Sequence, residues 1–233
     1  MEIQICYEDD FLIAVNKPNN LLVHHSFMAR NMEEETTLVA LLQEQLGLKL
    51  YPVHRLDRKT SGVLLLAKKR VEVKALQELF QQNGIQKTYH ALVRGFAPEE
   101  GVIDSPVKGR DAHVHKEAKT AYRKLQEIAL DIPVHPYSGS RYSLLELKPQ
   151  TGRLHQLRIH MNKISHPIVG DPKYGDRFHN RMFENELNFS KMFLHASSIQ
   201  FIHPFTKREL IIKVEFPEDW MALAEKFAWN LVD

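Results

Sequence analysis

Residues 54–67 read HRLDRKTSGVLLLA, a charged loop that leads directly into an apolar run. The apolar run, Val63 to Ala67, follows the turn-forming pair Ser61 and Gly62 and predicts a buried strand. Asp57 lies in the loop among two arginines and a lysine, cations that can pair with its carboxylate and attract an anionic substrate. Enzymes commonly present a catalytic side chain on a loop beside a rigid strand. From composition alone, a surface loop held by salt bridges and an Asx turn is the simpler interpretation.

The segments around this loop predict an α+β fold with a mixed, largely antiparallel central sheet flanked by helices and loops. Short β-prone runs bounded by turn residues predict strands at 3–7, 11–15, 63–67, 87–93, 120–125, 142–147, 192–202 and 209–216. Apolar residues at helical spacing predict helices from Thr36 or Thr37 to Gly47, over 71–82, from 151–155 to 163, and over 218–229. Because strands and helices do not alternate regularly, an α+β arrangement is favoured over a parallel βαβ sheet.

Length and composition limit the class of protein. With 233 residues and 43% hydrophobic composition, the chain can bury a real core, and we expect residues 1–233 to form a single catalytic domain. Its only cysteine, Cys6, cannot form an internal disulfide, which favours a reducing compartment and predicts a cytoplasmic protein. The first residues lack the pattern of a signal peptide, and no apolar run approaches the length that spans a membrane, so no membrane partner is expected.

Positive charge is concentrated in two segments although the net charge is only +2. Residues 147–170 carry Lys148, Arg153, Arg158 and Lys163 and contain no Asp or Glu, and residues 105–124 form a second basic stretch. Such local fields can neutralise phosphates if their cations share a face, which would suit a nucleic-acid partner. The alternative is a solvated surface whose cations are paired with acidic residues from elsewhere in the chain.

Five ordered blocks together resemble one enzyme family. HRLDRKTSG at 54–62 resembles the catalytic-loop signature of the RluA family of pseudouridine synthases, and QKTYHALVRG at 86–95 is similar to the tyrosine-bearing strand of that family. The later blocks are TGRLHQLRIH at 151–160, PIVGD at 167–171 with YG at 174–175, and LHA at 194–196 with HP at 203–204. With Asn16-Lys17-Pro18 near the start, the resemblance covers nearly the whole chain and implies the pseudouridine synthase fold.

The resemblance implies an isomerase that converts uridine to pseudouridine without a cofactor. Asp57 would be the nucleophile, and Tyr89 would stack on the target base and assist removal of the proton at C5. Arg158 would bind the carboxylate of Asp57 in a bidentate fork and fix its direction, which a lysine would do less well. Arg55 would fill the gap that the uridine leaves when it is flipped out of its stack.

The same resemblance implies an RNA surface and a substrate class. Residues expected to contact RNA are Arg55, Thr60, Lys148, Arg153, His155 and Gln156. Segments 85–90, 175–181, 203–206 and 220–229 are most similar to family members that modify tRNA, which implies tRNA as partner and uridine 65 as target. We expect no N-terminal S4 domain, because only 56 residues precede Asp57. An S4-less synthase acting on 23S rRNA and a non-catalytic RNA-binding protein stay open as alternatives, and no obligate protein partner is predicted.

The family's usual Asn-Lys-Pro-x-Gly turn ends here in Asn20, so Asn20 is expected to adopt the left-handed conformation that glycine supplies elsewhere. The 13 histidines include the close pairs His24–His25, His113–His115 and His155–His160, but none is part of an HExxH motif or has a carboxylate at ligand spacing. No metal site is predicted.

Overall fold

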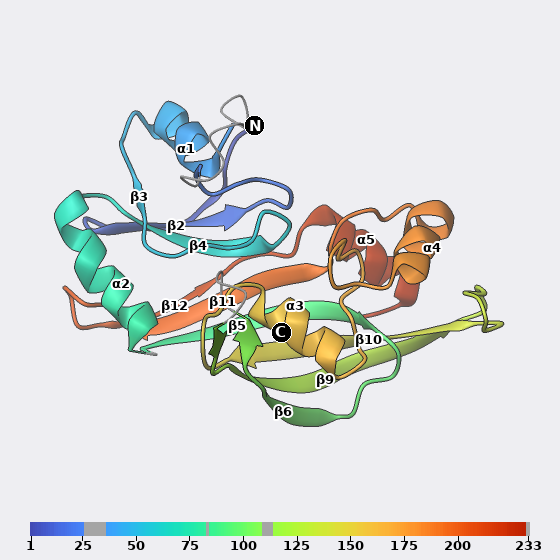
Figure 1. Cartoon of the computed structure of the whole chain (residues 1–233). Helices are drawn as coiled ribbons and strands as arrows, with labels where there is room; N and C mark the ends of the chain where they lie inside the picture. The colour runs from blue at the N-terminus through green and yellow to red at the C-terminus, as the bar shows by residue number, and fades with distance from the viewer. Residues whose placement is uncertain (26–35, 83, 109–113, 232–233) are drawn as a thin grey trace. The chain divides into compact units, whose positions relative to one another are not determined.

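The computed structural model describes residues 1–25, 36–82, 84–108 and 114–231 (Figure 1). Its contacts divide the chain into two compact units, which are described separately below. The first unit contains Met1–Gln86 and Ala196–Glu215, and the second contains Lys87–His195 and Phe216–Asp233. A single catalytic domain over 1–233 stays a prediction. Of the helices in the described ranges, none is both long enough and apolar enough to cross a bilayer.

The first unit is built on a sheet around the strand that follows the Asp57 loop. Its strands are β1 (Ile5–Glu8), β2 (Leu12–Lys17), β3 (Tyr51–Pro52), β4 (Ser61–Ala67), most of β11 (Leu194–Ile202) and β12 (Glu209–Lys213). β2 pairs with β1 and β4, and β11 pairs with β12, in each case antiparallel. All seven residues of β4 are buried, as the apolar run predicts, and the expected opening hairpin is present as β1 and β2.

The helices of the first unit begin and end close to the predicted positions. Helix α1 (Leu38–Leu46) is capped by Thr37, whose side chain accepts a hydrogen bond from the Ala40 amide, and it ends at Gly47 in the left-handed conformation. Helix α2 (Val73–Gln81) follows a 3-10 turn, η2 (Arg70–Glu72), so the segment predicted as one helix over 71–82 contains two helical types.

The second unit contains a four-stranded antiparallel run. Its strands, in the order β5-β10-β9-β6, are β5 (Ile85–Arg94), β10 (Ser140–Pro149), β9 (Lys119–Leu130) and β6 (Glu100–Asp104). The strands β9 and β10 form a long hairpin, drawn in yellow-green and yellow in Figure 1. A separate ribbon pairs β7 (Val107–Lys108) with β8 (His115–Lys116). β6 and this ribbon were not predicted.

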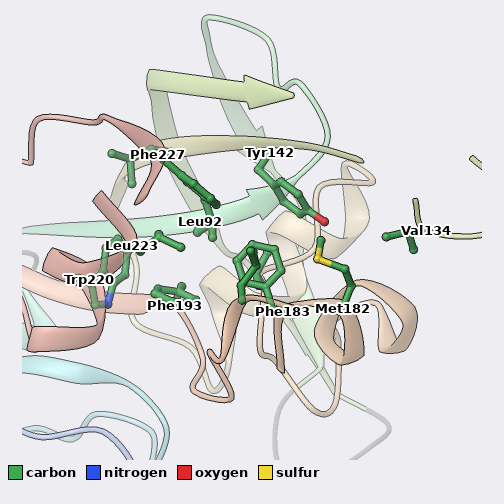
Figure 2. Close-up of a cluster of buried hydrophobic side chains, with 12 residues drawn as sticks. Leu92, Val134, Tyr142, Met182, Phe183, Phe193, Trp220, Leu223 and Phe227 are labelled. Atoms are coloured by element: carbon green, nitrogen blue, oxygen red, sulfur yellow. The ribbon is translucent and has the colours of Figure 1, made fainter. Parts of the chain in front are cut away.

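Two hydrophobic clusters stabilise the second unit. One contains residues of α4 (Arg177–Leu187) and α5 (Glu218–Phe227) together with Leu92 and Tyr142 from the sheet (Figure 2). The other includes residues of α3 (Gln156–Lys163) together with alternate residues of β5. Successive residues of a strand point to opposite faces, so β5 contributes to both clusters. Helix α4 was not predicted, but the α+β fold class is confirmed.

Candidate active site

The Asp57 loop is a tight turn held by the segment that follows β2. The amide of Thr60 donates to the carbonyl oxygen of Asp57 at 3.0 Å. The side-chain amide of Asn19 donates to the carbonyl of Lys59 at 2.6 Å, and Nε of Arg58 donates to Oδ1 of Asn20 at 3.1 Å. Asn20 has a φ of 63°, which confirms the predicted left-handed conformation. Contacts to both the backbone and the side chains of the turn therefore fix the loop that carries Asp57.

Lys17 is the buried centre of this arrangement. Its side chain is 0% exposed, and Nζ donates to the carbonyls of Arg58 at 3.0 Å, Pro18 at 2.8 Å and Leu21 at 3.0 Å. Burial lowers the pKa of Lys17 to about 7, although the nearby Asp57 carboxylate acts in the opposite direction. The sequence pattern predicts no role for Lys17, because a lysine at a strand end is ordinarily exposed.

Gly62 determines how β4 leaves the loop. Its φ is 117°, and a Cβ at this position would clash with the backbone of Ala196 in the neighbouring strand β11. Only glycine combines this backbone conformation with so close an approach. The loop residues after Asp57 therefore lead into a strand that packs closely against the backbone of β11.

Arg158 lies on helix α3 in the second unit and makes a buried ion pair. Nε donates to Oδ2 of Asp171 at 2.7 Å, and Nη2 donates to Oδ1 of the same carboxylate at 2.8 Å. Arg158 is 6% exposed and Asp171 is 1% exposed. The structure thus shows a bidentate contact of Arg158 with a carboxylate that sequence reasoning did not single out. The pairing of Arg158 with Asp57 stays a prediction.

Tyr89 lies on the face of β5 that packs toward helix α3. It is half-buried, pairs across the sheet with Leu147, and contacts the cluster that includes Leu157. Lys87, two residues earlier on the same face, lies beside Gly152, with 3.8 Å between its Nζ and the position of a Cβ there. Burial lowers the pKa of Lys87. The start of β5 and the loop before α3 are therefore neighbours, so the second and third signature blocks meet in this unit.

The predicted RNA contacts differ in accessibility. Arg55, Lys148 and Arg153 are exposed, and His155 is half-buried. Lys148 pairs with Glu146 at 3.0 Å, and Nε of Arg153 donates to the carbonyl of Glu117 at 2.9 Å. These four residues stay proposed RNA contacts.

Thr60 and Gln156 are nearly inaccessible, at 3% and 4% exposure. Oε1 of Gln156 accepts from the Thr151 hydroxyl at 2.7 Å and from the Arg153 amide at 3.0 Å. Its Nε2 donates to the carbonyl of Lys119 and to the hydroxyl of Thr120, both at 3.0 Å. In this conformation Gln156 shapes the loop before α3, and a direct RNA contact at Gln156 or Thr60 would require local opening.

Part of the basic stretch at 105–124 is paired with acidic side chains. Lys119 lies 3.2 Å from Asp104, Lys124 lies 2.7 Å from both Glu99 and Glu127, and Arg123 lies 3.4 Å from Glu146. These three cations therefore fit the alternative interpretation, in which surface cations form ion pairs with acidic side chains. Arg110 and His113 lie outside the described residues. Within the described ranges, no group of three or more His, Cys, Asp or Glu side chains could hold a metal ion.

Comparison with known proteins settles the family. The family model described as RNA pseudouridylate synthase matches residues 11–163. The chain belongs to this family. Its members are isomerases that convert uridine to pseudouridine, and the RluA-type resemblance of the sequence is confirmed.

Relatives and solved structures agree with this assignment. The chain is 40% identical over 240 residues to the tRNA pseudouridine synthase C of Vibrio parahaemolyticus, covering 99% of this chain and 97% of that protein. It is also 40% identical over 240 residues to the protein of the same name from Haemophilus influenzae, covering 99% of this chain and all of that protein. The solved structure of human RNA pseudouridylate synthase domain containing 4 has 25% sequence identity and a TM-score of 0.73, covering 99% of this chain and 95% of that chain.

Proposed function

We propose that this enzyme isomerises a specific uridine of tRNA, at position 65, to pseudouridine. The observation that carries the proposal is 40% identity over 99% of the chain to proteins named tRNA pseudouridine synthase C. The cytoplasm is the proposed location, because tRNA is the proposed substrate.

Asp57 is the proposed nucleophile. The reaction breaks the bond from N1 to C1′ and forms a bond from C5 to C1′, and a proton leaves C5 while N1 takes one up. The product is an isomer of the substrate, so no external oxidant, reductant or group donor is needed. A carboxylate can attack C1′ or C6, or abstract a sugar proton while the detached uracil turns, and all three routes require Asp57 to be ionised and fixed.

Several contacts support this role. The contacts from Lys17, Asn19 and Asn20 hold the loop in one conformation, so little ordering would be left for the substrate to induce. Tyr89 is half-buried in the middle of strand β5, and its aromatic ring can stack on a base. Exposed Arg55, two residues before Asp57, can enter the gap that a flipped uridine leaves.

Arg158 is proposed to orient the Asp57 carboxylate through hydrogen bonds that strengthen as charge develops during the reaction. Its contact with Asp171 fixes its guanidinium plane.

Mapping pseudouridines in cells tests the substrate. Carbodiimide modification of total RNA from cells lacking this protein should show loss of one pseudouridine, at uridine 65 of tRNA. A plasmid carrying the wild-type gene should restore it, and a plasmid carrying Asp57→Asn should not. Loss of a 23S rRNA pseudouridine instead would transfer the same chemistry to ribosomal RNA. An unchanged map would overturn the proposed activity.

A further inference from the structure

A second carboxylate is built into the surroundings of Arg158. Asp171 is almost completely buried, and its carboxylate accepts from Nε and Nη2 of Arg158 at 2.7 and 2.8 Å. Oδ1 of Asp171, which accepts from Nη2 of Arg158, also accepts from the amides of Lys173 at 2.8 Å and Tyr174 at 3.0 Å. Burial raises the pKa of Asp171, but these hydrogen bonds and the charge of Arg158 outweigh it, and the pKa lies below its usual range. Asp171 is therefore a charged partner of Arg158 at neutral pH.

The backbone around Asp171 is fixed by other residues. The side chain of Asn180 accepts from the Gly170 amide at 2.8 Å and donates to the Asp171 carbonyl at 2.9 Å. The Gly175 amide donates to the same carbonyl at 3.1 Å. A Cβ at Gly170 would clash with the backbone of Lys191, and Gly170 has a φ of 77°. These contacts hold Asp171 in place independently of Arg158. The carboxylate is therefore a fixed acceptor that can determine the orientation of the guanidinium.

Tyr174 holds the other side of Arg158. The guanidinium lies 5.2 Å from the centroid of the Tyr174 ring, a cation–π geometry. The Tyr174 hydroxyl is hydrogen-bonded to Nδ1 of His155 at 3.0 Å, and His155 immediately precedes helix α3. The side chain of Asn162 donates to the Tyr174 carbonyl at 2.8 Å. The plane and the direction of the Arg158 guanidinium are thus both constrained.

The geometry divides the donors of Arg158 between two edges. A guanidinium has five N–H donors, and the contact with Asp171 uses one from Nε and one from Nη2. Two of the three remaining donors lie on the Nη1–Nη2 edge, which can also bind a carboxylate with two parallel hydrogen bonds. Because Asp171 balances the charge of Arg158, this edge offers directed donors with little net positive charge.

We propose that Asp171 is a positioning residue for the reaction: it holds the guanidinium of Arg158 in one orientation and balances its positive charge. The inference rests on the proposed function, in which Asp57 is the nucleophile. A carboxylate paired with an unbalanced arginine is a weaker nucleophile, whereas one that receives directed hydrogen bonds from a charge-balanced arginine keeps more of its reactivity.

The test uses Asp171→Asn, with Asp219→Asn as a matched control. Asp219 pairs with Lys191 on the surface of the same unit, at 2.8 Å, so both variants remove one negative charge. We expect Asp171→Asn to lower the single-turnover rate of pseudouridine formation by about tenfold or more, with the tRNA dissociation constant within about threefold of wild type. The acidic limb of its pH–rate profile should move to lower pH, because Arg158 is no longer balanced. Asp219→Asn should match wild type in rate and profile.

Repeating the Asp171→Asn change in the Arg158→Lys variant distinguishes a positioning role of Asp171 from a general structural role. Arg158→Lys keeps the positive charge but cannot make a two-point contact with a carboxylate. If Asp171 acts through the fork of Arg158, adding Asp171→Asn to Arg158→Lys should lower the rate less than twofold further. A full additional tenfold loss in the double variant would overturn the proposal.

Folding and function can be told apart. Circular dichroism and tRNA binding report whether Asp171→Asn is folded, and if it is not, Asp171→Glu provides the test because it keeps the charge. Asp171→Glu should lower the rate through misalignment and leave the acidic limb where it is in wild type. A wild-type rate and profile for Asp171→Asn would refute the positioning role. Absence of product with the wild-type enzyme would instead refute the proposed function.

Discussion

Lys17 shows how one buried residue can link the stability of a unit to the geometry of the Asp57 loop. All three N–H donors of its ammonium group are used by backbone carbonyls, one of them in the Asp57 loop. In the folded state its pKa is about 7, whereas an unfolded lysine titrates near 10.5. Between these values the unfolded chain binds one more proton than the folded chain, so raising the pH through this window favours folding.

This linkage gives a prediction for Lys17→Met. Between pH 7.5 and 9, the wild-type free energy of unfolding should rise relative to that of Lys17→Met, by up to about 2 kcal/mol. Lysines and tyrosines elsewhere titrate in both proteins and cancel in the difference. Urea unfolding at several pH values measures it. A difference that stays constant with pH would show that Lys17 titrates normally in the folded protein.

The sequence predicts the conformation or role of some site residues but not of others. The left-handed Asn20 was predictable, because a glycine position filled by asparagine keeps its backbone requirement. The roles of Lys17 and Asp171 were not, although both lie in quoted blocks. Their burial depends on residues outside their own blocks: the carbonyl of Arg58 for Lys17, and Arg158 and Asn180 for Asp171.

At the scale of elements, strands and helices with strong local signals were predicted well. The apolar run of β4 and the capped helix α1 are present nearly as expected. Helix α4 was missed because its sequence, RFHNRMFENEL, is mostly polar. The available signals were Asp176, which caps the helix by accepting from two amides, and the helical i, i+4 spacing of the apolar residues Phe183 and Leu187. Packing against the sheet, rather than local preference, explains this helix.

A buried hydrogen bond connects α4 to the sheet and gives a second prediction. The Tyr142 hydroxyl is bonded to Nδ1 of His179 at 2.7 Å, and both side chains are buried. Tyr142→Phe should lower the free energy of unfolding by about 1–3 kcal/mol, because it leaves a buried ring nitrogen without its partner. Tyr137→Phe is the control, since Tyr137 is 70% exposed and should tolerate the change. Equal midpoints in urea for the two variants would show that the bond contributes no net stability.

At the scale of the whole molecule, the two compact units were not predicted. Two of their three boundaries, at 86/87 and 195/196, fall inside strands β5 and β11, and no change in composition marks either position. The third, at 215/216, lies between β12 and α5. Unit boundaries are usually sought in polar or glycine-rich linkers, and a chain that divides within strands provides no such signal. The charge pattern was informative in part, because several of the clustered cations are paired with acids.

The surface charge leads to a prediction for tRNA binding. Arg153→Ala and Lys148→Ala should each weaken binding and reduce the salt slope of log Kd by about 1, as expected if each cation contacts one phosphate. Lys226→Ala, an exposed change on α5, is the control. Binding curves at several salt concentrations measure the slopes. Unchanged slopes for Arg153→Ala and Lys148→Ala would place the tRNA elsewhere on the surface.

The role of Asp57 is tested most directly by a single-turnover assay of purified enzyme with unmodified tRNA. The wild-type protein should convert uridine 65 to pseudouridine, and Asp57→Asn should bind the same tRNA with similar affinity and form no product. Product from Asp57→Asn at the wild-type rate would contradict the assignment of the nucleophile. Absence of product from the folded, tRNA-binding wild-type protein would contradict the proposed activity itself.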